Sequence, residues 1–369
     1  MKKILFLIHD LGHGGAEKVL VNLVNNMDPS KFHITVIALF GGGINEQFLA
    51  PHVHFHAIWN HALPGNSKLM KLLTPRQLHK LCVKEHYDIE VSYLEGPSAR
   101  IISGCPHKDT RLICWIHCTI HSRKDLSRSF RSYNEALACY SNFDKLVYVS
   151  RDVKDRFLQY CPVETSHEVL YNTNLSDIIL KKSTVPLPTD FPSAAFHWCG
   201  MGKLESNKGF DRMLRIQKRL IEEGYSTCLH IVGTGPQEDS LKKYAQAEGL
   251  DPCVCFEGYR TNPYPYLRNC DLFVCASFSE GFSTAATEAL IVGTPVCTVE
   301  VSGMKEMLGE HNEYGIVTDN TEEALYNGIK KLLDDSALLK HYTTQATLRG
   351  RDFSTEETVR AVEDMLFSL

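Results

Sequence analysis

The sequence predicts an α/β protein of two Rossmann-like domains, each with a parallel sheet, that face a central cleft. Short apolar runs alternate with helical patterns in both halves of the chain, which is typical of parallel β/α folds. A chain of 369 residues is too long for one ordinary domain core, so two domains are expected. Hydrophobic residues make up 43% and charged residues 22%, a composition that indicates a globular protein and not a disordered chain.

Apolar runs of strand length recur along the chain. In the first half they are Lys3–Ile8, His33–Leu39, Ile89–Tyr93, Leu112–Ile116 and Lys145–Val149. In the second half they are Phe196–Cys199, Cys228–Val232, Val254–Phe256, Asp271–Cys275, Pro295–Val299 and Gly315–Val317. A charge soon follows the first run and no cleavage-site pattern appears, so a strand is predicted there and not a signal peptide. No run approaches the ~20 apolar residues that span a bilayer.

The domain boundaries are predicted from composition. The stretch Ser183–Pro192 holds three prolines and suits an inter-domain linker. The expected domains are therefore residues 1–180 and residues 193–350. The remaining residues, 351–369, contain an amphipathic helical pattern with no strand after it.

Cysteine content and charge bear on the compartment. The 13 cysteines are odd in number and scattered, which favours a reducing cytoplasm over a disulfide framework.

Residues 1–175 carry a net charge of +4 and the remainder −9, and segments 66–86 and 121–131 supply the basic excess. Leucines interleave with the lysines of 66–86, and such a basic amphipathic helix can lie on anionic lipid. An ordinary surface helix with its apolar face on the core is the alternative.

A glycine-rich loop, Gly12–Gly15, lies between the first strand and the first helix. Glycines at such a turn let the backbone approach a phosphate, and the helix N-terminus favours negative charge. The loop does not match a dinucleotide fingerprint, because Glu17 occupies the third glycine position and no acid follows the second strand. A simple tight turn is the alternative.

Two further loops follow strands of the second half. In the first, Lys203 and Lys208 are five residues apart and can converge on a diphosphate, although ordinary solvated lysines are the alternative. In the second, Glu280 precedes a helix that Ser283 or Thr284 can cap, which leaves backbone N–H groups for a phosphate. Glu288 lies about a turn inside that helix. Ionised carboxylates accept strong hydrogen bonds from sugar hydroxyls, whereas the alternative is two ordinary glutamates.

Four segments of the second half occur in a characteristic order: Gly202–Gly209, Ile231–Pro236, Phe256–Tyr259 and the Glu-x7-Glu unit from Glu280 to Glu288. Together with Gly14-Gly15-Ala16-Glu17 they resemble the retaining glycosyltransferases of family 4, which have the GT-B fold. The resemblance spans nearly the whole chain. It implies that the final helix crosses back onto the N-terminal domain.

The resemblance also implies roles for individual residues. Lys203 and Lys208 would hold the diphosphate, and Glu288 would bind the ribose of a nucleotide-sugar donor. Glu280 would bind hydroxyls of the donor sugar, and His117, which follows a strand, matches the active-site histidine near that sugar. The catalytic residues implied are His117, Glu280 and Lys208. The donor-binding residues implied are Gly14, Gly15, Gly202, Lys203, Lys208, Gly233, Tyr259, Arg260, Glu280, Gly281, Phe282, Ser283, Thr284 and Glu288.

The sequence departs from the family pattern in three places. Lysine stands at position 203, where arginine is usual, so the charge is kept but the bidentate fork is lost. Ser283 replaces the second glycine of the usual Glu-Gly-Phe-Gly, and Tyr171–Asn174 replaces a usual Asn-Gly. These departures bear on how the donor is placed and not on the class of protein.

No metal or cofactor is expected. Cys114, His117, Cys118 and His121 fall within eight residues, but Cys114 belongs to a strand and no second ligand cluster has a usual zinc spacing. A structural role for His117 remains an alternative to its place in the active site. The chain contains no Asp-x-Asp, the metal-clamping sequence of other glycosyltransferases, which favours a metal-independent reaction.

These observations predict a metal-independent, retaining enzyme that transfers a hexose or N-acetylhexosamine from a nucleotide-diphosphate sugar, most simply a UDP-sugar. The expected acceptor is a saccharide or lipid-linked saccharide in polysaccharide, lipopolysaccharide or glycoconjugate biosynthesis. The enzyme is expected in the cytoplasm, with peripheral contact to the inner face of the cell membrane through 66–86 and 121–131, and without nucleic acid. The alternatives are a nucleotide-sugar epimerase of the same fold and a non-catalytic subunit that binds sugar nucleotides.

Overall fold

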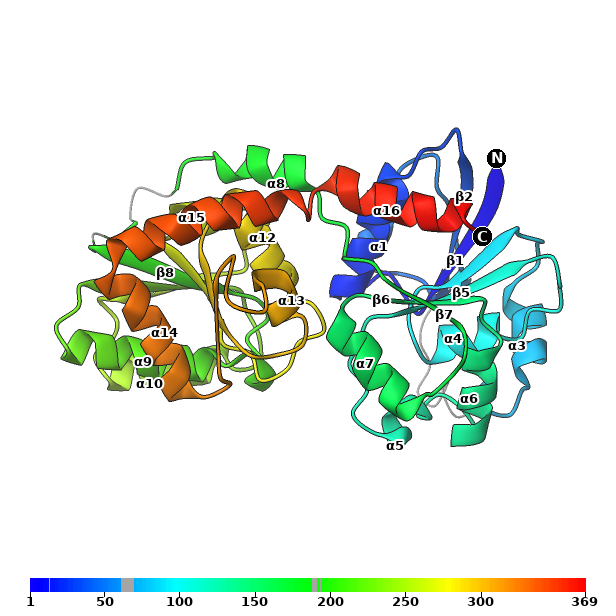
Figure 1. Cartoon of the computed structure of the whole chain (residues 1–369), viewed down its shortest axis with the longest axis horizontal. Helices are drawn as coiled ribbons and strands as arrows, with labels where there is room; N and C mark the ends of the chain where they lie inside the picture. Colours follow the sequence, from blue (N-terminus) through cyan, green and yellow to red (C-terminus); the bar gives the residue numbers. More distant parts are fainter. Residues whose placement is uncertain (13, 61–69, 188–190, 193) are drawn as a thin grey trace. The chain divides into compact units, whose positions relative to one another are not determined.

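The computed structural model describes all residues except 13, 61–69, 188–190 and 193 (Figure 1). His13, the start of the basic segment 66–86 and Ser193, the predicted first residue of the second domain, lie outside the described residues. The chain forms two compact units. One comprises Met1–Asn174 and Thr358–Leu369, and the other comprises Leu175–Glu357.

The N-terminal unit is built on a seven-stranded sheet with the order β3-β2-β1-β4-β5-β6-β7, in which every described strand pair is parallel. The strands are β1 (Lys2–Ile8), β2 (Phe32–Phe40), β3 (His54–Trp59), β4 (Ile89–Ser92), β5 (Arg111–Ile116), β6 (Lys145–Tyr148) and β7 (Ser166–Val169). The central strands are buried along most of their length, because helices cover both faces of a parallel sheet, and β4 even buries Glu90 and Ser92.

Helices connect these strands as the alternation of apolar and helical patterns predicts. They are α1 (Gly15–Asn26), η1 (Ile44–Phe48), α3 (Pro75–Cys82), α4 (Pro97–Ile102), α5 (Arg123–Leu126), α6 (Tyr133–Ser141) and α7 (Arg151–Tyr160). Serine or threonine caps several of them: Thr74 before α3, Ser122 before α5, Ser132 before α6 and Ser150 before α7 each accept a backbone N–H bond.

The C-terminal unit is built on a six-stranded parallel sheet with the order β10-β9-β8-β11-β12-β13. The strands are β8 (Phe196–Met201), β9 (Thr227–Val232), β10 (Val254–Gly258), β11 (Leu272–Cys275), β12 (Val296–Val299) and β13 (Ile316–Thr318). The order reverses between β8 and β11. Loops after these two strands therefore meet at a topological switch point, where ligands bind in open α/β sheets.

The helices of this unit are α8 (Ser176–Ser183), η2 (Ser206–Lys208), α9 (Phe210–Glu222), α10 (Glu238–Ala247), α11 (Tyr264–Asn269), α12 (Thr284–Val292), α13 (Met304–Leu308), α14 (Glu322–Asp334) and α15 (Ser336–Arg351). Figure 1 shows α9, α10 and α14 on one face of the sheet and α8 and α12 on the other. The first face carries the main core, in which Trp198, Leu229 and Leu272 pack beneath Phe210 and Leu325.

The predicted fold class is confirmed: the chain forms two Rossmann-like units with parallel sheets. Every predicted strand is present within a few residues of its expected bounds. The strands β3 and β7 were not among the predicted runs, because both lie at a sheet edge and carry polar side chains. Among the described residues, no helix combines the length and the hydrophobicity that crossing a membrane requires.

The last helix, α16 (Thr355–Phe367), returns to the N-terminal unit from Thr358 onward, as the crossing helix was predicted to do. Glu363 anchors it there, since its carboxylate accepts bonds from the Asp28 backbone N–H at 2.7 Å and from Lys31 Nζ at 2.9 Å. The ring of Phe367 lies 4.9 Å from that of Phe32. The helix thus completes the N-terminal unit with residues from the far end of the chain.

Replacing Glu363 with alanine should destabilise the protein, because it removes the acceptor of the Asp28 N–H and one of the two carboxylates that pair with Lys31. Loss of such partly buried hydrogen bonds costs about 1–3 kcal/mol, which corresponds to a fall of about 2–10 °C in melting temperature. Thermal unfolding of the full chain measures this fall in melting temperature. Asp364→Ala, at an exposed position of the same helix, is the matched control, and an equal shift in both variants would contradict the anchoring role.

Candidate functional site

Lys208 and Glu280 come together in the C-terminal unit. Lys208 ends η2, which follows β8, and Glu280 lies in the loop after β11. The Lys208 Nζ atom is 2.7 Å from Glu280 Oε1, and Ser277 Oγ donates to the same oxygen at 2.7 Å. The Glu280 side chain is 11% exposed and that of Lys208 is 27% exposed, so solvent screens this ion pair only in part.

Backbone geometry holds the two loops against each other. Phe278 N–H donates to the Asn207 carbonyl at 2.7 Å. Gly209 has φ +70°, and a Cβ atom there would collide with the Ala276 carbonyl oxygen. Only glycine therefore allows η2 to approach the loop after β11 so closely. The last glycine of the Gly-Lys-Leu-x3-Lys-Gly sequence, Gly209, is therefore required for packing between the two loops.

The helix α12 begins beside Glu280. Ser283 caps it by accepting the Ala286 N–H at 3.3 Å, which is the role that the sequence allowed for Ser283 or Thr284. Phe282 is buried, with its ring 5.9 Å from that of Phe353. Gly281 connects the cap to Glu280. The start of α12 therefore has a fixed position, with its first backbone N–H groups at the end of the Glu280 loop.

Glu288 lies one turn inside α12 and is not a surface glutamate, because it is only 5% exposed. Its Oε1 atom accepts a hydrogen bond from the Tyr264 hydroxyl at 3.4 Å, and Tyr264 begins α11. A buried carboxylate needs hydrogen-bond donors, and ligand hydroxyls can supply them.

Two glycines shape the ends of neighbouring strands. Gly202 follows β8 with φ +152°, and Gly233 follows β9 with φ +143°. A Cβ atom on Gly233 would collide with the Gly202 carbonyl oxygen. The Gly233 N–H donates to the Gly258 carbonyl at 2.9 Å, so the ends of β8, β9 and β10 form one closely packed edge.

The remaining predicted donor-side residues are more exposed. Lys203 is 66% exposed and pairs with Glu205 at 2.5 Å. Tyr259 is 73% exposed. Arg260 Nη2 lies 3.1 Å from Glu257 Oε2, and its guanidinium lies over the Tyr266 ring at 5.4 Å. The structure thus gathers Lys208, Glu280 and the start of α12, whereas Lys203 has a different partner.

The N-terminal unit has its own cavity of about 410 Å³, which adjoins the strand ends of β1, β4 and β5. The lining residues are His9, Gly15, Ala16, Glu17, Leu94, Glu95, Pro97, Ser98, His117 and Cys118. Gly14 is the N-cap of α1, and a Cβ atom there would collide with the Glu17 carboxylate. The predicted glycine loop and His117 therefore lie at one cavity, although their sequence positions are about 100 residues apart.

His117 is buried at the wall of this cavity. Its ring lies 4.8 Å from that of Tyr93, and its Nε2 atom has no hydrogen-bond partner among the described residues. Burial lowers the pKa of His117 to about 3, so the imidazole is neutral at physiological pH. A neutral imidazole with an unused ring nitrogen can bond to a ligand hydroxyl.

Two carboxylates beside His117 were not among the predicted site residues. Glu95 Oε2 accepts the His117 backbone N–H at 3.0 Å, and Glu17 also lines the cavity. Burial raises the pKa of Glu17. Glu95 lies three residues after the end of β4, in the region where open α/β sheets bind ligands.

The zinc alternative at His117 gains no support from the geometry. Cys114 is buried within β5, whereas Cys118 is exposed. Within the described ranges, His117 belongs to none of the groups of His, Cys, Asp and Glu whose ligand atoms lie within 4.8 Å of one another.

Comparison with known proteins identifies the family. The model of "Glycosyl transferases group 1" matches residues 196–349, and that of "Glycosyltransferase Family 4" matches residues 13–173. A 4-alpha-N-acetylgalactosaminyltransferase of Campylobacter jejuni, which acts on N-acetylgalactosamine-N,N'-diacetylbacillosaminyl-diphospho-undecaprenol, is 27% identical over 98% of both chains.

A further relative and a solved structure are similar to this chain. The lipopolysaccharide core biosynthesis glycosyltransferase LpsD of Rhizobium meliloti is 29% identical over 63% of this chain and 66% of its own. The crystal structure of Anabaena Alr3699/HepE in complex with UDP matches with a TM-score of 0.80, covers 100% of both chains and is 19% identical. The chain belongs to the family 4 glycosyltransferases, with the GT-B fold, and is a glycosyltransferase.

Proposed function

We propose that this enzyme transfers a hexose or N-acetylhexosamine, with retention of configuration, from a UDP-sugar to a lipid-linked saccharide. The observation that carries the proposal is the grouping of Lys208, Glu280 and buried Glu288 around the start of α12. Two of the similar proteins support the finer details. The Campylobacter relative acts on a diphospho-undecaprenol-linked saccharide, and the Anabaena neighbour forms a complex with UDP.

The grouping suits a nucleotide-diphosphate sugar. Lys208 and the first N–H groups of α12 would bind the diphosphate, because the helix N-terminus favours negative charge. Glu288 would accept hydrogen bonds from the ribose hydroxyls, and Glu280 from hydroxyls of the sugar. Lys208 presently neutralises Glu280, so donor binding would redirect the ammonium from the carboxylate to a phosphate.

Leaving-group stabilisation would then need no metal. As the bond from the anomeric carbon to the diphosphate oxygen breaks, Lys208 and the α12 N–H groups would stabilise the charge that develops on that oxygen. The acceptor hydroxyl would attack from the face that the diphosphate leaves, which retains the configuration. Its proton would pass to the departing phosphate oxygen, so atoms and charge balance without a protein nucleophile.

In the N-terminal unit, neutral His117 and the carboxylate of Glu95 suit saccharide hydroxyls, which both donate and accept hydrogen bonds. We propose that this cavity binds saccharide hydroxyls. Glu17 lines the same cavity and would contribute a further carboxyl group.

A thermal-shift screen over nucleotide sugars tests the proposal directly. A ligand that binds only the folded protein raises the melting temperature by mass action, so UDP-sugars should stabilise the chain more than GDP- or ADP-sugars. Transfer from the best UDP-sugar to a polyprenyl-diphosphate-linked saccharide would follow, with the anomer of the product determined by NMR. Stabilisation by no nucleotide sugar, or an inverted product, would overturn the proposal.

Changes to the three donor-side residues should separate UDP binding from transfer. Lys208→Ala and Glu288→Ala should each weaken UDP binding by about 10- to 100-fold, because each removes a charged hydrogen-bond partner. Glu280→Ala should leave UDP affinity unchanged or higher, since it releases Lys208, but should reduce transfer by about 100-fold or more. Isothermal titration and a transfer assay measure both quantities.

Lys242→Ala is the matched control, because Lys242 is an exposed lysine of α10 that pairs with Glu238. It should leave UDP affinity unchanged. Equal loss of UDP affinity in the Lys208, Glu280 and Glu288 variants would contradict the division of roles.

The lowered pKa of His117 predicts a pH dependence of stability. Below pH ~6.5 the unfolded chain protonates this histidine while the folded chain, with a pKa of about 3, does not. The unfolded state therefore binds more protons, and stability falls as the pH decreases. Between pH 6.5 and 5 the loss should be about 2 kcal/mol, which His117→Asn should abolish.

Denaturant unfolding at the two pH values measures this difference. His311→Asn, at an exposed position of the C-terminal unit, is the control and should keep the wild-type pH dependence. An unchanged pH dependence in His117→Asn would contradict a neutral buried imidazole. Full transfer activity in the same variant would remove His117 from the active site.

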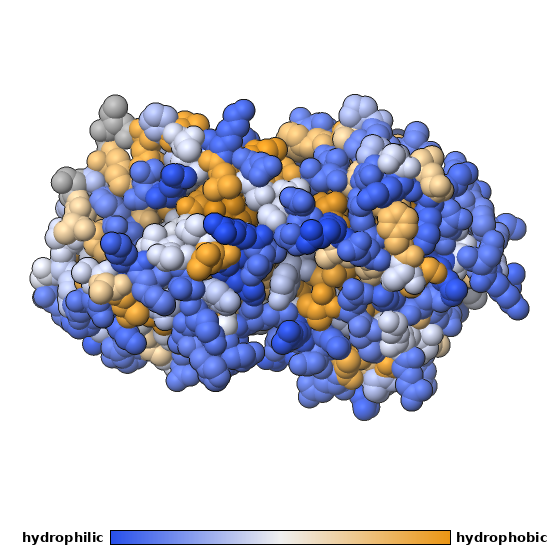
Figure 2. All heavy atoms as spheres, turned by 45° about the horizontal axis from the view of Figure 1, so that its top comes forward, coloured by the Kyte–Doolittle hydropathy of each residue, from blue (hydrophilic) through white to orange (hydrophobic). Residues whose placement is uncertain are grey.

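The basic segments support a peripheral membrane contact only in part. The apolar residues Leu78 and Cys82 of α3 are buried, which fits the alternative of an ordinary surface helix. Leu72 and Leu81 are 74% and 45% exposed, beside exposed Lys80. On the face in Figure 2, hydrophobic residues are scattered among hydrophilic ones. We propose that Leu72 and Leu81 enter the interface while the lysines contact anionic lipid on the cytoplasmic face.

Lys71→Glu with Lys80→Glu should reduce binding to vesicles that contain phosphatidylserine by about 25-fold or more, because each basic residue near an anionic surface contributes ~1 kcal/mol. Vesicle sedimentation measures the partition. Lys242→Glu with Lys243→Glu is the control, with the same charge change in the C-terminal unit. Equal binding of the wild-type protein to neutral and anionic vesicles would contradict the electrostatic contact.

A further inference from the structure

A cluster of histidine and cysteine side chains lies on one face of the C-terminal sheet, and the proposed reaction does not use it. His197 of β8 is the cross-strand partner of Cys228 in β9, and His230 of β9 is the partner of Cys255 in β10. Cys228 and His230 are two residues apart on one strand, so their side chains point to the same face. The register therefore places two histidines and two cysteines in a compact group.

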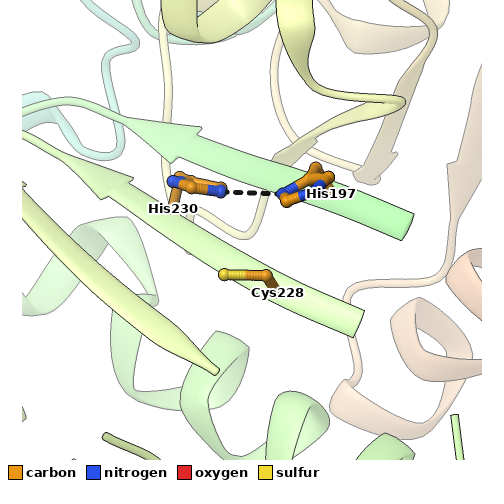
Figure 3. Close-up of side chains that lie close together, drawn as sticks. All are labelled: His197, Cys228 and His230. Carbon is orange, nitrogen blue, oxygen red and sulfur yellow. Dashed lines mark hydrogen bonds between the residues drawn. The ribbon is translucent and has the colours of Figure 1, made fainter. Parts of the chain in front are cut away.

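Two distances within this group suit a tetrahedral metal site, and His230 lies within 4.8 Å of ligand atoms of His197, Cys228 and Cys255. His197 Nδ1 lies 3.1 Å from His230 Nε2, and Cys228 Sγ lies 3.8 Å from Cys255 Sγ. The ligand atoms of His197, Cys228 and His230 all lie within 4.8 Å of one another, and Figure 3 shows these three side chains together. Zinc bound by two nitrogens and two sulfurs at ordinary bond lengths separates the nitrogens by about 3.3 Å and the sulfurs by about 3.8 Å.

A carboxylate orients one of the histidines. Glu257 Oε1 lies 3.0 Å from His230 Nδ1, on the side of the ring away from His197. A carboxylate there fixes the Nδ1–H tautomer, which leaves the Nε2 lone pair directed at the centre of the cluster. The strand pairing shifts its register between Phe256 and Gly258, so Glu257 sits at an irregularity that sets the direction of its side chain. Such a carboxylate–histidine arrangement is characteristic of metal ligands.

The histidine–cysteine cluster is buried on one side and accessible to solvent on the other. His230 and Cys228 are buried, whereas His197 and Cys255 are partly exposed. The Phe191 ring stacks on His230 at 4.4 Å with an interplanar angle of 2° and lies 4.7 Å from the His197 ring. This arrangement excludes water from the buried ligands and leaves a route for an ion.

We propose that His197, Cys228, His230 and Cys255 bind one zinc ion, with Glu257 as the carboxylate that positions His230. Two neutral imidazoles and two thiolates in tetrahedral array select zinc among the common divalent ions. Each thiol releases its proton as it binds. The ion would tie β8, β9 and β10 together. Three of the four ligands, His197, Cys228 and Cys255, are each the second residue of their strand. The zinc site therefore lies at the opposite end of the strands from the proposed donor-binding loops, which follow the carboxyl ends.

Cobalt(II) titration of the full-length protein tests the site, because cobalt replaces zinc and its absorption reports tetrahedral thiolate ligands. The reduced wild-type protein, stripped with a chelator, should bind one equivalent and develop thiolate-to-cobalt charge-transfer bands. Zinc should displace the cobalt. His197→Gln, at a partly exposed position, should weaken cobalt binding by at least 10-fold, and Cys228→Ser should lose half of the thiolate absorption.

Glu257→Gln should keep the thiolate bands but weaken cobalt binding by about 10- to 100-fold, as loss of a carboxylate behind a metal-bound histidine does. Cys253→Ser is the matched control, because this neighbouring thiol donates to the Leu250 carbonyl and lies outside the ligand set; it should bind cobalt like the wild type. Absence of thiolate bands in the wild type, or bands unchanged in both His197→Gln and Cys228→Ser, would overturn the proposal.

Discussion

The ion pair between Lys208 and Glu280 is the interaction on which the proposed donor site depends. Its two members come from loops after β8 and β11, the neighbouring strands between which the strand order reverses. Because the pair is partly buried, neither charge can be left without a partner at low cost. The folded protein therefore holds a cation and a carboxylate at the start of α12 before any donor binds. A diphosphate sugar offers a partner for each, since phosphate suits the ammonium and hydroxyls suit the carboxylate.

The backbone imposes the same constraint as the charges. Gly209 and Gly233 stand where a Cβ atom would collide with a carbonyl oxygen of a neighbouring loop. Their φ values are positive, which other residues rarely adopt. The close approach of the loops thus depends on glycines, which have no side chain to bind a ligand. Glycine-rich segments of this kind serve ligand binding indirectly, because they bring the strand-end loops near enough for one ligand to contact several of them.

The sequence predicted the fold well, because apolar runs in a parallel sheet are continuous and easily recognised. The apolar runs did not include β3 and β7, whose edge positions leave polar side chains on the strand, so that the apolar pattern weakens. At the site, the resemblance assigned roles to Lys208, Glu280 and Glu288, and the structure brings Lys208 and Glu280 into contact. The sequence could not reveal that Lys203 pairs with Glu205, since that pairing depends on the course of a loop. Glu95 also escaped, because a lone glutamate after a short strand carries no motif.

The histidine–cysteine cluster shows why spacing along the chain is a poor guide to metal ligands within a parallel sheet. In zinc-binding loops the ligands come in pairs that are close in sequence, whereas here only Cys228 and His230 are, and the four side chains come from three strands and span residues 197–255. Only the register brings them together, and register follows from tertiary pairing. The zinc alternative around His117, which the sequence did not favour, had the opposite character: its residues are close in sequence, but Cys114 is buried in a strand and Cys118 is exposed. A parallel sheet separates sequence neighbours onto opposite faces and joins distant residues across strands, so its metal sites must be sought in the strand pairing.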